Sequence, residues 1–527
     1  MFLARGVFFC LALPYGDPLD EPYHFGYATY LWETGHPPPS AAPSMADEIT
    51  RPFRTLPWYP SFASRAITWS SIVALSPSER LGRRESAFAP GPDRTRWSGP
   101  NYESQQPPLA YLLTGWPLLL LRNARLSTRL LTLRLAATLV SAAALPMLLA
   151  LCRRVAPERP ARGMFLAITA FPGLGIFLGR YTNDAVAFPL IAAALLAALP
   201  AADGTLSPRR SIVAGIALAA AIWTKIYALT LVPALPAAAL LAPTGRRAKM
   251  LLRASSAALL ALALTAPWAV RQWRDSGSLS GLTEAKDARA AGVGLVDAAR
   301  AAPRLLNRPV AVAFWRTFLW PGTWSALGAV DAVARILRIG LLSILLAVLL
   351  GKRPLPVERR RALFLATAVL FFLFGQLFHA ATFEATARAL GRNAPAGTEG
   401  WYLLAMLGAA VPAVALVRRP SAALMVSAAA IFFLADLVAI LGVLPLVYAD
   451  AAGPIAHGAG PAQYAALLRA VSGATRVLGA VSLAGSAGPI VAALLVWAAS
   501  AITAGVAAVR TPAPARSAVR SEDELPV

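Results

Sequence analysis

Two acidic motifs beside apolar stretches hold the residue types in this chain that are best suited to chemistry. The first motif is PLDEPYHF at residues 18–25, and the second is YESQQPPLAY at residues 102–111. Carboxylates at a membrane boundary are costly to desolvate, so their presence needs a functional reason. A positioned carboxylate can accept a proton from a hydroxyl group, and Asp20, Glu21 and Glu103 are therefore candidate catalytic residues.

Structural explanations remain open for both motifs. Asp20 and Glu21 could be a solvated loop pair, or Asp20 could cap a helix that starts near Tyr23. The two prolines at 107–108 are best explained as a helix entry, because proline suits a first helical turn. For Glu103, substrate contact and a structural role both remain open.

The composition is that of a membrane protein. Of the 527 residues, 57% are hydrophobic and 14% are charged, and the mean hydropathy is +0.57. The formal net charge of +23 could suggest nucleic acid, but the arginines lie in short loops between apolar runs, as at 153–154, 209–210, 246–247 and 359–361. This is the positive-inside pattern, and it indicates the lipid bilayer, with its anionic inner leaflet, as the partner instead of nucleic acid.

Apolar runs long enough to cross a bilayer follow one another along most of the chain. They predict an all-α polytopic membrane protein with about 11–13 transmembrane helices and juxtamembrane helices in the first large outer loop. One transmembrane domain is expected over residues 1–510, and a disordered cytoplasmic tail over 511–527. The predicted spans are 131–152, 163–180, 184–200, 211–227, 228–242, 250–271, 337–351, 362–381, 401–417, 421–443 and 489–508.

Residues 2–15 form one more apolar run, which is too short to span a bilayer. No small-residue cleavage site precedes the acidic motif, which argues against a signal peptide. We expect this run to be the end of a first helix that begins upstream of Met1.

Arginine placement orients the spans. The basic loops at 153–162, 201–210, 244–249, 352–361 and 418–420 are predicted to be cytoplasmic. Alternation then puts the outer face at 16–130, 181–183, 272–336, 382–400 and 444–488. The outer loop 16–130 includes a predicted amphipathic surface helix, since aromatic and apolar residues recur near helical spacing between Tyr23 and Leu31.

The weak point of this topology is the apolar run 108–121, which four arginines follow: Arg122, Arg125, Arg129 and Arg134. If the run spanned the bilayer, these arginines would be cytoplasmic and every later loop would change sides. We therefore predict that 108–121 lies in the outer interface, which suits its prolines and tryptophan.

This topology gathers the unusual polar residues near the spans on the outer side. Convergence on one face is what an active site at the membrane surface needs. The residues concerned are Asp17, Asp20, Glu21, His24, Glu103, Arg180, Asn183, Asp184, Lys225, His379, Arg392, Glu399 and Tyr402.

Taken in order, the motifs resemble a known family. The chain has Asp-Glu-Pro at 20–22, Glu-x-x-Gln-Pro-Pro-Leu-x-Tyr at 103–111, Asn-Asp-Ala at 183–185, Thr-Lys at 224–225 and Glu-Gly-x-Tyr-Leu at 399–403. Their order and shared sidedness resemble the GT-C superfamily of integral-membrane glycosyltransferases. The branch most similar is that of the protein O-mannosyltransferases, the aminoarabinose transferases and their uncharacterised bacterial relatives.

The resemblance implies a polyprenyl-phosphate-linked sugar as donor and a lipid, glycan or protein as acceptor. It also implies an active site on the outer face of a bacterial cytoplasmic membrane, and inversion at the anomeric carbon. Carried over to this chain, Asp20 is the general base for the acceptor hydroxyl, and Glu21 orients either the acceptor or Asp20.

The remaining candidates are substrate contacts. Arg180 and Lys225 are candidates for the donor phosphate, although snorkelling anchors would also explain them. Trp401 stands where the related family commonly has an arginine, so Arg392 is the candidate to replace that arginine from upstream. The predicted contacts to the acceptor or substrate are His24, Asn183, Asp184, Glu399 and Tyr402, with a helix N-cap as the alternative for Asn183.

Metal use is undecided from the sequence. Asp20 and Glu103 could share a divalent cation, but two carboxylates far apart in sequence do not make a site. A transporter or flippase of a lipid-linked sugar and an inactive envelope scaffold are the competing functions. A transporter predicts polar residues near the midplane, where the sequence offers Asp436, which could equally be a paired structural residue.

Overall fold

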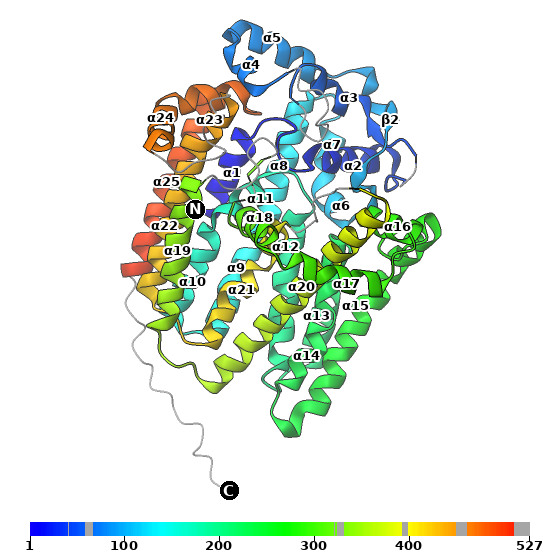
Figure 1. Cartoon of the computed structure of the whole chain (residues 1–527), viewed down its shortest axis with the longest axis vertical. Coiled ribbons are helices and arrows are strands. Elements are labelled where there is room, and N and C mark those ends of the chain that lie inside the picture. The colour runs from blue at the N-terminus through cyan, green and yellow to red at the C-terminus, as the bar shows by residue number, and fades with distance from the viewer. Residues whose placement is uncertain are drawn as a thin grey trace.

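The computed structural model is almost entirely helical. Its named strands form one two-stranded antiparallel sheet, β1 (Met45–Ala46) with β2 (Trp97–Gly99). Figure 1 shows long helices side by side, with the short helices α3 (Asp47–Thr50), α4 (Trp69–Ala74) and α5 (Pro77–Phe88) at one end. The predicted all-α polytopic fold is confirmed. The structure describes residues 1–39, 42–57, 67–320, 322–323, 331–392, 399–449 and 461–510, so the predicted tail lies outside it.

By length and composition, six helical segments among the described residues can cross a bilayer, or seven if one bent pair is a span. The bent pair is α10 (Glu158–Ala170) and α11 (Pro172–Gly179), which meet at 55°. The break follows from the sequence, because a residue before proline avoids the helical conformation. The six segments are Leu126–Val155, Asp184–Ala201, Thr244–Asp275, Pro356–Ala389, Ala422–Tyr448 and Ala487–Ala508.

The other predicted spans form shorter or interrupted helices. The run 211–227 corresponds to α13 (Pro208–Ile222), and 228–242 is divided between η5 (Ile226–Leu231) and α14 (Ala234–Leu240). Pro233, which separates η5 from α14, accounts for the division. The run 337–351 lies in α19 (Asp331–Leu349), and 401–417 is divided among η8 (Gly400–Met406), α21 (Leu407–Ala413) and η9 (Val414–Leu416).

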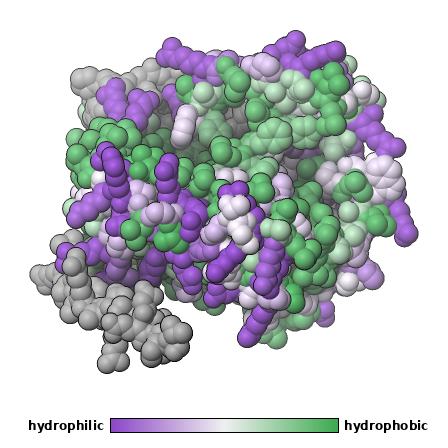
Figure 2. Space-filling view, turned by 90° about the horizontal axis from the view of Figure 1, so that it is seen from below, coloured by the Kyte–Doolittle hydropathy of each residue, from purple (hydrophilic) through white to green (hydrophobic). Residues whose placement is uncertain are grey.

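Four of the five basic loops contact one another. Arg361 donates from Nε to Asp203 Oδ2 over 2.7 Å and from Nη1 to the carbonyl of Arg154. Arg419 pairs with Glu358 over 2.6 Å. These contacts bring loops that are far apart in sequence to one end, as the predicted topology requires. Figure 2 views the molecule from below, where hydrophilic side chains project between apolar ones.

The described residues of 16–125, here called the cap, lie over the opposite end from these loops (Figure 1). The cap contains α2 (Glu21–Thr34), which ends at Gly35 with φ 76°. The prediction of a surface helix at Tyr23–Leu31 is wrong, because nine of the 14 residues of α2 are buried. Its polar side chains find partners inside the protein, so the helix needs no solvent face.

The run 108–121 is too short to span a bilayer. It forms α6 (Leu109–Gly115) and α7 (Pro117–Leu120), with an interruption at Trp116. Leu113, Trp116 and Leu120 are exposed. An interfacial position for this apolar surface stays a prediction.

Two of the four arginines after this run are buried in ion pairs to the cap. Both lie on α8 (Leu126–Ala142), where Arg129 pairs with Glu48 and Arg134 pairs with Glu21. These two arginines therefore do not act as lipid-facing topology signals, which weakens the conflict that the four raised in the sequence.

The predicted outer loops 272–336 and 444–488 also contain helices. The helices are α16 (Thr283–Ala290), α17 (Leu295–Leu305), α18 (Arg308–Leu319), α23 (Leu444–Tyr448) and α24 (Pro461–Val481). The start of α16 contacts the second acidic motif, where the backbone N–H of Thr283 donates to Gln105 Oε1 over 2.7 Å. The first apolar run forms α1 (Phe2–Ala12), which packs inside the helix bundle.

Candidate active site

Asp20 occupies the N-cap position of α2 without capping it. Its backbone is left-handed, with φ 58° and ψ 3°, and it is the only non-glycine residue with positive φ in the described part of the chain. Its side chain makes no cap hydrogen bond and is half-buried. The capping explanation therefore fails, and the carboxylate is left available in a conformation that carries strain.

Burial and the neighbouring charges both shift the pKa of Asp20. Burial raises the pKa of the Asp20 carboxyl, while Arg180 and Lys225 lower it and Asp184 raises it further. The net direction is upward, because loss of hydration outweighs the two cations. A carboxylate with a raised pKa is a stronger base, as proton abstraction requires.

Glu21 is held in place by hydrogen bonds on both oxygens. Arg134 donates to it from Nε over 2.7 Å and from Nη2 over 2.5 Å, and the backbone N–H of Tyr181 donates over 2.8 Å. The remaining N–H groups of Arg134 donate to the carbonyls of Cys10, Leu13 and Pro14. We call this pair, Glu21 with Arg134, the clamp. It positions the segment that carries Asp20, so Glu21 acts on Asp20 through the backbone.

The Asn183-Asp184 turn forms the centre of a buried polar cluster at the start of α12 (Asp184–Ala198). Lys225 Nζ donates to Asn183 Oδ1 over 2.8 Å and lies 3.4 Å from the Asp184 carboxylate. Tyr227 donates its hydroxyl to Asp184 Oδ1 over 2.9 Å. The Asn183 side chain makes no cap hydrogen bond, so a capping role does not account for it.

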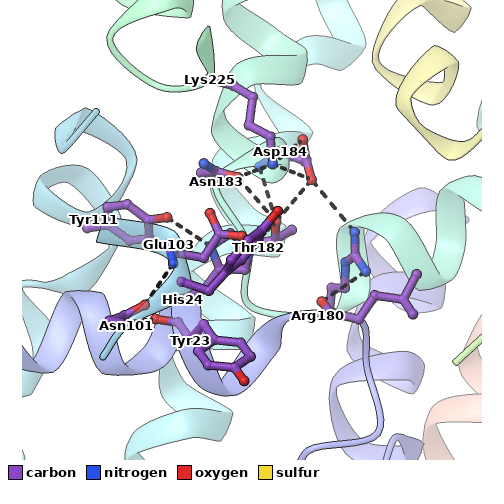
Figure 3. Close-up of polar contacts among 12 residues, drawn as sticks. Tyr23, His24, Asn101, Glu103, Tyr111, Arg180, Thr182, Asn183, Asp184 and Lys225 are labelled. Atoms are coloured by element: carbon purple, nitrogen blue, oxygen red, sulfur yellow. Dashed lines mark hydrogen bonds and ion pairs between the residues drawn. The ribbon is translucent and has the colours of Figure 1, made fainter. Parts of the chain in front are cut away.

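Arg180 approaches the same carboxylate from the other side, as Figure 3 shows. Its Nη2 lies 3.6 Å from Asp184 Oδ2, and its Nη1 donates to the carbonyl of Leu19 over 3.0 Å. Arg180 is 4% exposed and Lys225 is 7% exposed, so neither reaches solvent as a snorkelling anchor would. Two cations therefore share one carboxylate.

The second acidic motif meets this cluster through His24. Its Nδ1 lies 2.8 Å from the Tyr111 hydroxyl, and its Nε2 lies 3.3 Å from Thr182 Oγ1 and 3.7 Å from Glu103 Oε1. Burial, together with Lys225 and Arg180, lowers the pKa of His24 well below its ordinary value. The imidazole is therefore neutral, with one nitrogen as donor and the other as acceptor.

The donors available around Thr182 identify the His24 tautomer. The Thr182 hydroxyl lies 3.1 Å from Asp184 Oδ2, and a carboxylate can only accept, so the single hydroxyl hydrogen goes to Asp184. His24 must then donate from Nε2 to Thr182 and accept at Nδ1 from Tyr111. A continuous chain of hydrogen bonds thus runs from Tyr111 to Asp184.

Glu103 is buried and carries an unused oxygen. Its backbone N–H donates to Asn101 Oδ1 over 2.9 Å, which fixes the turn, while Oε2 has no hydrogen-bond partner among the described residues. Burial raises the pKa of Glu103 to about 8, with Lys225 opposing the rise and Asp20 adding to it. At neutral pH Glu103 is therefore mainly a neutral acid that can donate a hydrogen bond.

Unsatisfied polar atoms mark where a ligand would make contacts. Within the described residues, Glu103 Oε2, Asn183 Nδ2 and Arg180 Nε are buried without a hydrogen-bond partner. Buried polar groups are normally paired, so three orphans in one cluster indicate missing partners. A carboxyl group, an amide donor and a guanidinium donor fit hydroxyl and phosphate groups of a ligand.

The Glu-Gly-x-Tyr-Leu motif at 399–403 reaches the polar cluster only in part. Tyr402 packs against Tyr227, with ring centroids 6.1 Å apart. Burial raises the pKa of Glu399 to about 7, and Asp20 contributes to the rise. Arg392 lies apart from the cluster, because its side chain is 64% exposed and lies 3.8 Å from Asp287 of α16. It follows the carboxyl end of α20 (Pro356–Ala389), outside the buried polar cluster. A contact from Arg392 to the donor phosphate stays a prediction.

Some members of the site were not identified from the sequence. Thr182 and Tyr227 were given no role, although both lie within two residues of a predicted contact. Arg134 was interpreted only as a topology signal. No group of three or more potential metal ligands occurs in the described ranges, and the sequence made no metal assignment.

Comparisons with known proteins find similar structures. No family model and no curated protein matches the chain. ArnT from Cupriavidus metallidurans bound to undecaprenyl phosphate has 13% identity and a TM-score of 0.42, covering 96% of this chain and 76% of that one. Its apo state has 13% identity and a TM-score of 0.43, covering 95% and 75%.

Proposed function

We propose that the protein is a membrane glycosyltransferase that moves a sugar from a polyprenyl-phosphate-linked donor to an acceptor hydroxyl. The observation that carries the proposal is the free carboxylate of Asp20. It is half-buried, has no hydrogen bond or ion pair within the described residues, and lies in the field of Arg180 and Lys225. A base must keep its lone pairs free until the substrate arrives.

The transfer makes one bond and breaks another. The acceptor oxygen attacks the anomeric carbon opposite the phosphate, and the bond between that carbon and the phosphate oxygen breaks. Its electron pair leaves on the phosphate, and the acceptor proton passes to Asp20. A direct displacement of this kind inverts the configuration of the sugar.

Arg180 and Lys225 hold the phosphate in this proposal. Their ion pairs within the described part of the chain both go to Asp184, so one negative charge is shared between two positive ones. The excess positive charge suits a lipid phosphate and stabilises the leaving group as its charge grows. Arg180 Nε is free to donate to a phosphate oxygen.

The other predicted residues are proposed to contact the substrate at its edges or to position the residues that contact it. Asn183 Nδ2 and Glu103 Oε2 are the proposed contacts to sugar or acceptor hydroxyls. His24 contacts both Glu103 and Thr182 and positions them. Glu399 and Tyr402 belong to the motif at 399–403, at the edge of the cluster. The site is proposed for the outer face of a bacterial cytoplasmic membrane, because the basic loops lie at the opposite end.

A transporter has less support from the geometry. Its candidate midplane residue, Asp436, lies 2.9 Å from Arg5 Nη1 and is fully buried. The ion pair explains why Asp436 is retained inside an apolar helix. An inactive scaffold would have no reason to keep a strained, unpaired Asp20.

The test is sugar transfer by the purified full-length protein from a panel of polyprenyl-phosphate sugars. Asp20→Asn should lower the rate about 10²- to 10⁴-fold, as loss of a general base does, while the protein stays folded. Asp297→Asn, at a surface carboxylate on α17, is the matched control and should leave the rate unchanged. Equal rates in Asp20→Asn and wild type would reject Asp20 as base, and transfer from no donor would reject the enzyme class.

A further inference from the structure

The candidate site has an exposed aromatic side chain beside its acidic residues. Tyr102 is 44% exposed, although the next residue, Glu103, is buried. The Tyr102 ring packs edge-to-face against Tyr23, with ring centroids 6.2 Å apart. Asn101 Nδ2 donates to the carbonyl of Tyr23 over 2.9 Å, which fixes this segment against the first turn of α2. Tyr102 therefore lies beside the turn that carries Asp20, and its side chain is open to a ligand.

A carboxylate from a distant segment holds Tyr102 in place. The Tyr102 hydroxyl donates to Glu284 Oε1 over 3.0 Å, across 182 residues of sequence. The residue before Glu284 is anchored as well, because the backbone N–H and the hydroxyl of Thr283 both donate to Gln105 Oε1, over 2.7 and 3.1 Å. Glu284 is therefore a member of the site, although it belongs to none of the motifs in the sequence.

Glu284 lies on the same side of the site as two other carboxyl groups. Burial raises the pKa of Glu399 to about 7, and the charges of Asp20 and Glu284 add to the rise. All three carboxyl groups are half-buried, so a ligand can reach them. Neither Glu284 nor Glu399 makes an ion pair within the described ranges. We call Tyr102, Glu284 and Glu399 the acidic side of the site.

A buried atom without a partner adjoins the acidic side. Glu103 is 3% exposed, and its Oε2 has no hydrogen-bond partner in the described part of the chain. Burial raises the pKa of Glu103 to about 8, and the charges of Asp20 and Glu284 are among those that add to the rise, so both lie close to it. Buried polar atoms are normally paired, and a hydroxyl group of a bound ligand would supply the missing partner.

The two sides of the site carry opposite charges. Arg180 and Lys225 both pair with Asp184, which leaves an excess of positive charge for the donor phosphate. The acidic side instead offers carboxylate oxygens and an aromatic ring. Like charges repel, so the acidic side disfavours a ligand that carries phosphate or another anionic group.

The chemistry of the acidic side fits a carbohydrate. The carbon–hydrogen face of a sugar ring is apolar and packs on an aromatic ring, while the hydroxyl groups at its edge donate hydrogen bonds to carboxylates. Several carboxyl groups match a ligand with several hydroxyls better than they match the single hydroxyl of a serine or threonine side chain.

We propose that the acceptor is a carbohydrate without anionic groups, whose ring packs on Tyr102 and whose hydroxyls bind Glu284 and Glu399. The inference rests on the proposed function, because it names the class of acceptor for the same site. A phosphorylated sugar and a serine-containing peptide are the alternatives, and each is an outcome of the test below.

The test measures acceptor binding without a donor, by saturation-transfer difference NMR on the full chain in a detergent that contains no sugar. The probes are the methyl glycosides of glucose, mannose, galactose and N-acetylglucosamine, their 6-phosphates, and an uncharged serine peptide. Tyr102→Ala and Glu284→Gln alter the acidic side. The matched controls are Trp116→Ala, at an exposed aromatic residue of the cap, and Glu85→Gln, at an exposed carboxylate. Transfer to the same probes from the polyprenyl-phosphate sugars is assayed in parallel.

Wild type and both controls should bind at least one neutral glycoside about tenfold or more tightly than its 6-phosphate and the peptide. Tyr102→Ala and Glu284→Gln should each weaken that binding about tenfold. Equal or tighter binding of the 6-phosphates, binding of no glycoside, or unchanged binding in both variants would overturn the proposal.

The parallel assay separates this inference from the proposed function. Transfer that depends on Asp20 but reaches only the peptide or a 6-phosphate would overturn the carbohydrate acceptor and leave the glycosyltransferase standing. Binding of neutral glycosides at Tyr102, with transfer from no donor, would support the carbohydrate site and reject the glycosyltransferase.

Discussion

Asp20 and Glu21 are consecutive carboxylates in opposite environments. Glu21 is fully buried and accepts three hydrogen bonds, two from Arg134 and one from the Tyr181 backbone. Asp20 is half-buried, strained and without a hydrogen bond in the described part of the chain. The difference shows that burial of an acidic residue does not by itself indicate function. The two carboxylates differ in whether the protein already uses their hydrogen-bonding capacity.

The same contrast separates the two regions to which these residues belong. In the clamp, all five N–H groups of Arg134 donate to an acceptor. In the polar cluster, Glu103, Asn183 and Arg180 each keep an unpartnered atom. We therefore expect changes in the clamp to lower stability and changes in the cluster to lower activity.

The largest expected effect is that of Arg134→Met. The variant leaves three buried backbone carbonyls without their Arg134 donors and leaves the Glu21 carboxylate without its cation, with only the Tyr181 N–H still donating to it. Breaking such a buried pair costs about 3–5 kcal/mol. Thermal unfolding of the purified protein in detergent measures the loss. Asp20→Asn, one residue from the clamp, is the control and should unfold near the wild-type temperature. A wild-type melting temperature for Arg134→Met would contradict the comparison.

A smaller effect is expected for Lys225→Met, on binding instead of stability. Lys225 makes charge-assisted contacts of the kind worth about 1.5–3 kcal/mol each, so donor affinity should fall roughly 10- to 100-fold. Titration with polyprenyl phosphate measures the change. Lys249→Met, on an exposed lysine of a basic loop, is the control. If the two variants bind equally well, Lys225 does not hold the phosphate.

The sequence predicts the fold better than it predicts which side chains pair within the fold. Hydropathy locates the apolar helices, because a bilayer imposes length and composition on every span. It does not predict the breaks that proline introduces at Phe171-Pro172 and Pro233, which reduce the helices long enough to span. The sequence predicts a helix over Tyr23–Leu31 but not its burial, because the spacing of apolar residues does not show what covers the rest of the helix.

The candidate site is predicted in part for the same reason. Asp20, Glu103 and the Asn-Asp turn stand out because charged or polar groups are rare beside apolar runs. Arg134 does not, because its partner Glu21 is 113 residues away and only folding brings them together. The sequence also does not show that Arg392 lies apart from the polar cluster, because the orientation of a surface side chain follows from tertiary structure. Whether the gathered residues act in catalysis stays a prediction.

The third prediction concerns the pH dependence that Glu103 gives to the protein. Burial raises the pKa of Glu103 from its ordinary 4.5 to about 8, so the folded protein holds a proton that the unfolded chain releases. This contribution to stability is complete below pH 4.5 and is lost as pH rises through about 8. Glu103→Gln mimics the neutral acid and should flatten this slope while keeping transfer near neutral pH.

The measurement is the melting temperature against pH for wild type and Glu103→Gln, with transfer rates at each pH. Tyr111→Phe is the control, because it disturbs the same network without removing the titrating group. A Glu103→Gln variant that keeps the wild-type slope would show that Glu103 does not titrate in this range. Loss of transfer at neutral pH would show that the ionised form is the active one.

The smallest expected effect is also the one that best separates the two neighbours. Asp20 has φ 58°, a conformation that costs an ordinary residue about 1 kcal/mol and glycine almost nothing. Asp20→Gly should therefore stabilise the protein by up to about 1 kcal/mol while abolishing transfer. Asp20→Ala, which keeps the strain and also lacks the carboxylate, should abolish transfer without the stability gain. If Asp20→Gly is instead less stable than Asp20→Ala, the strain is not relieved by glycine, and the carboxylate owes its position to packing and not to function.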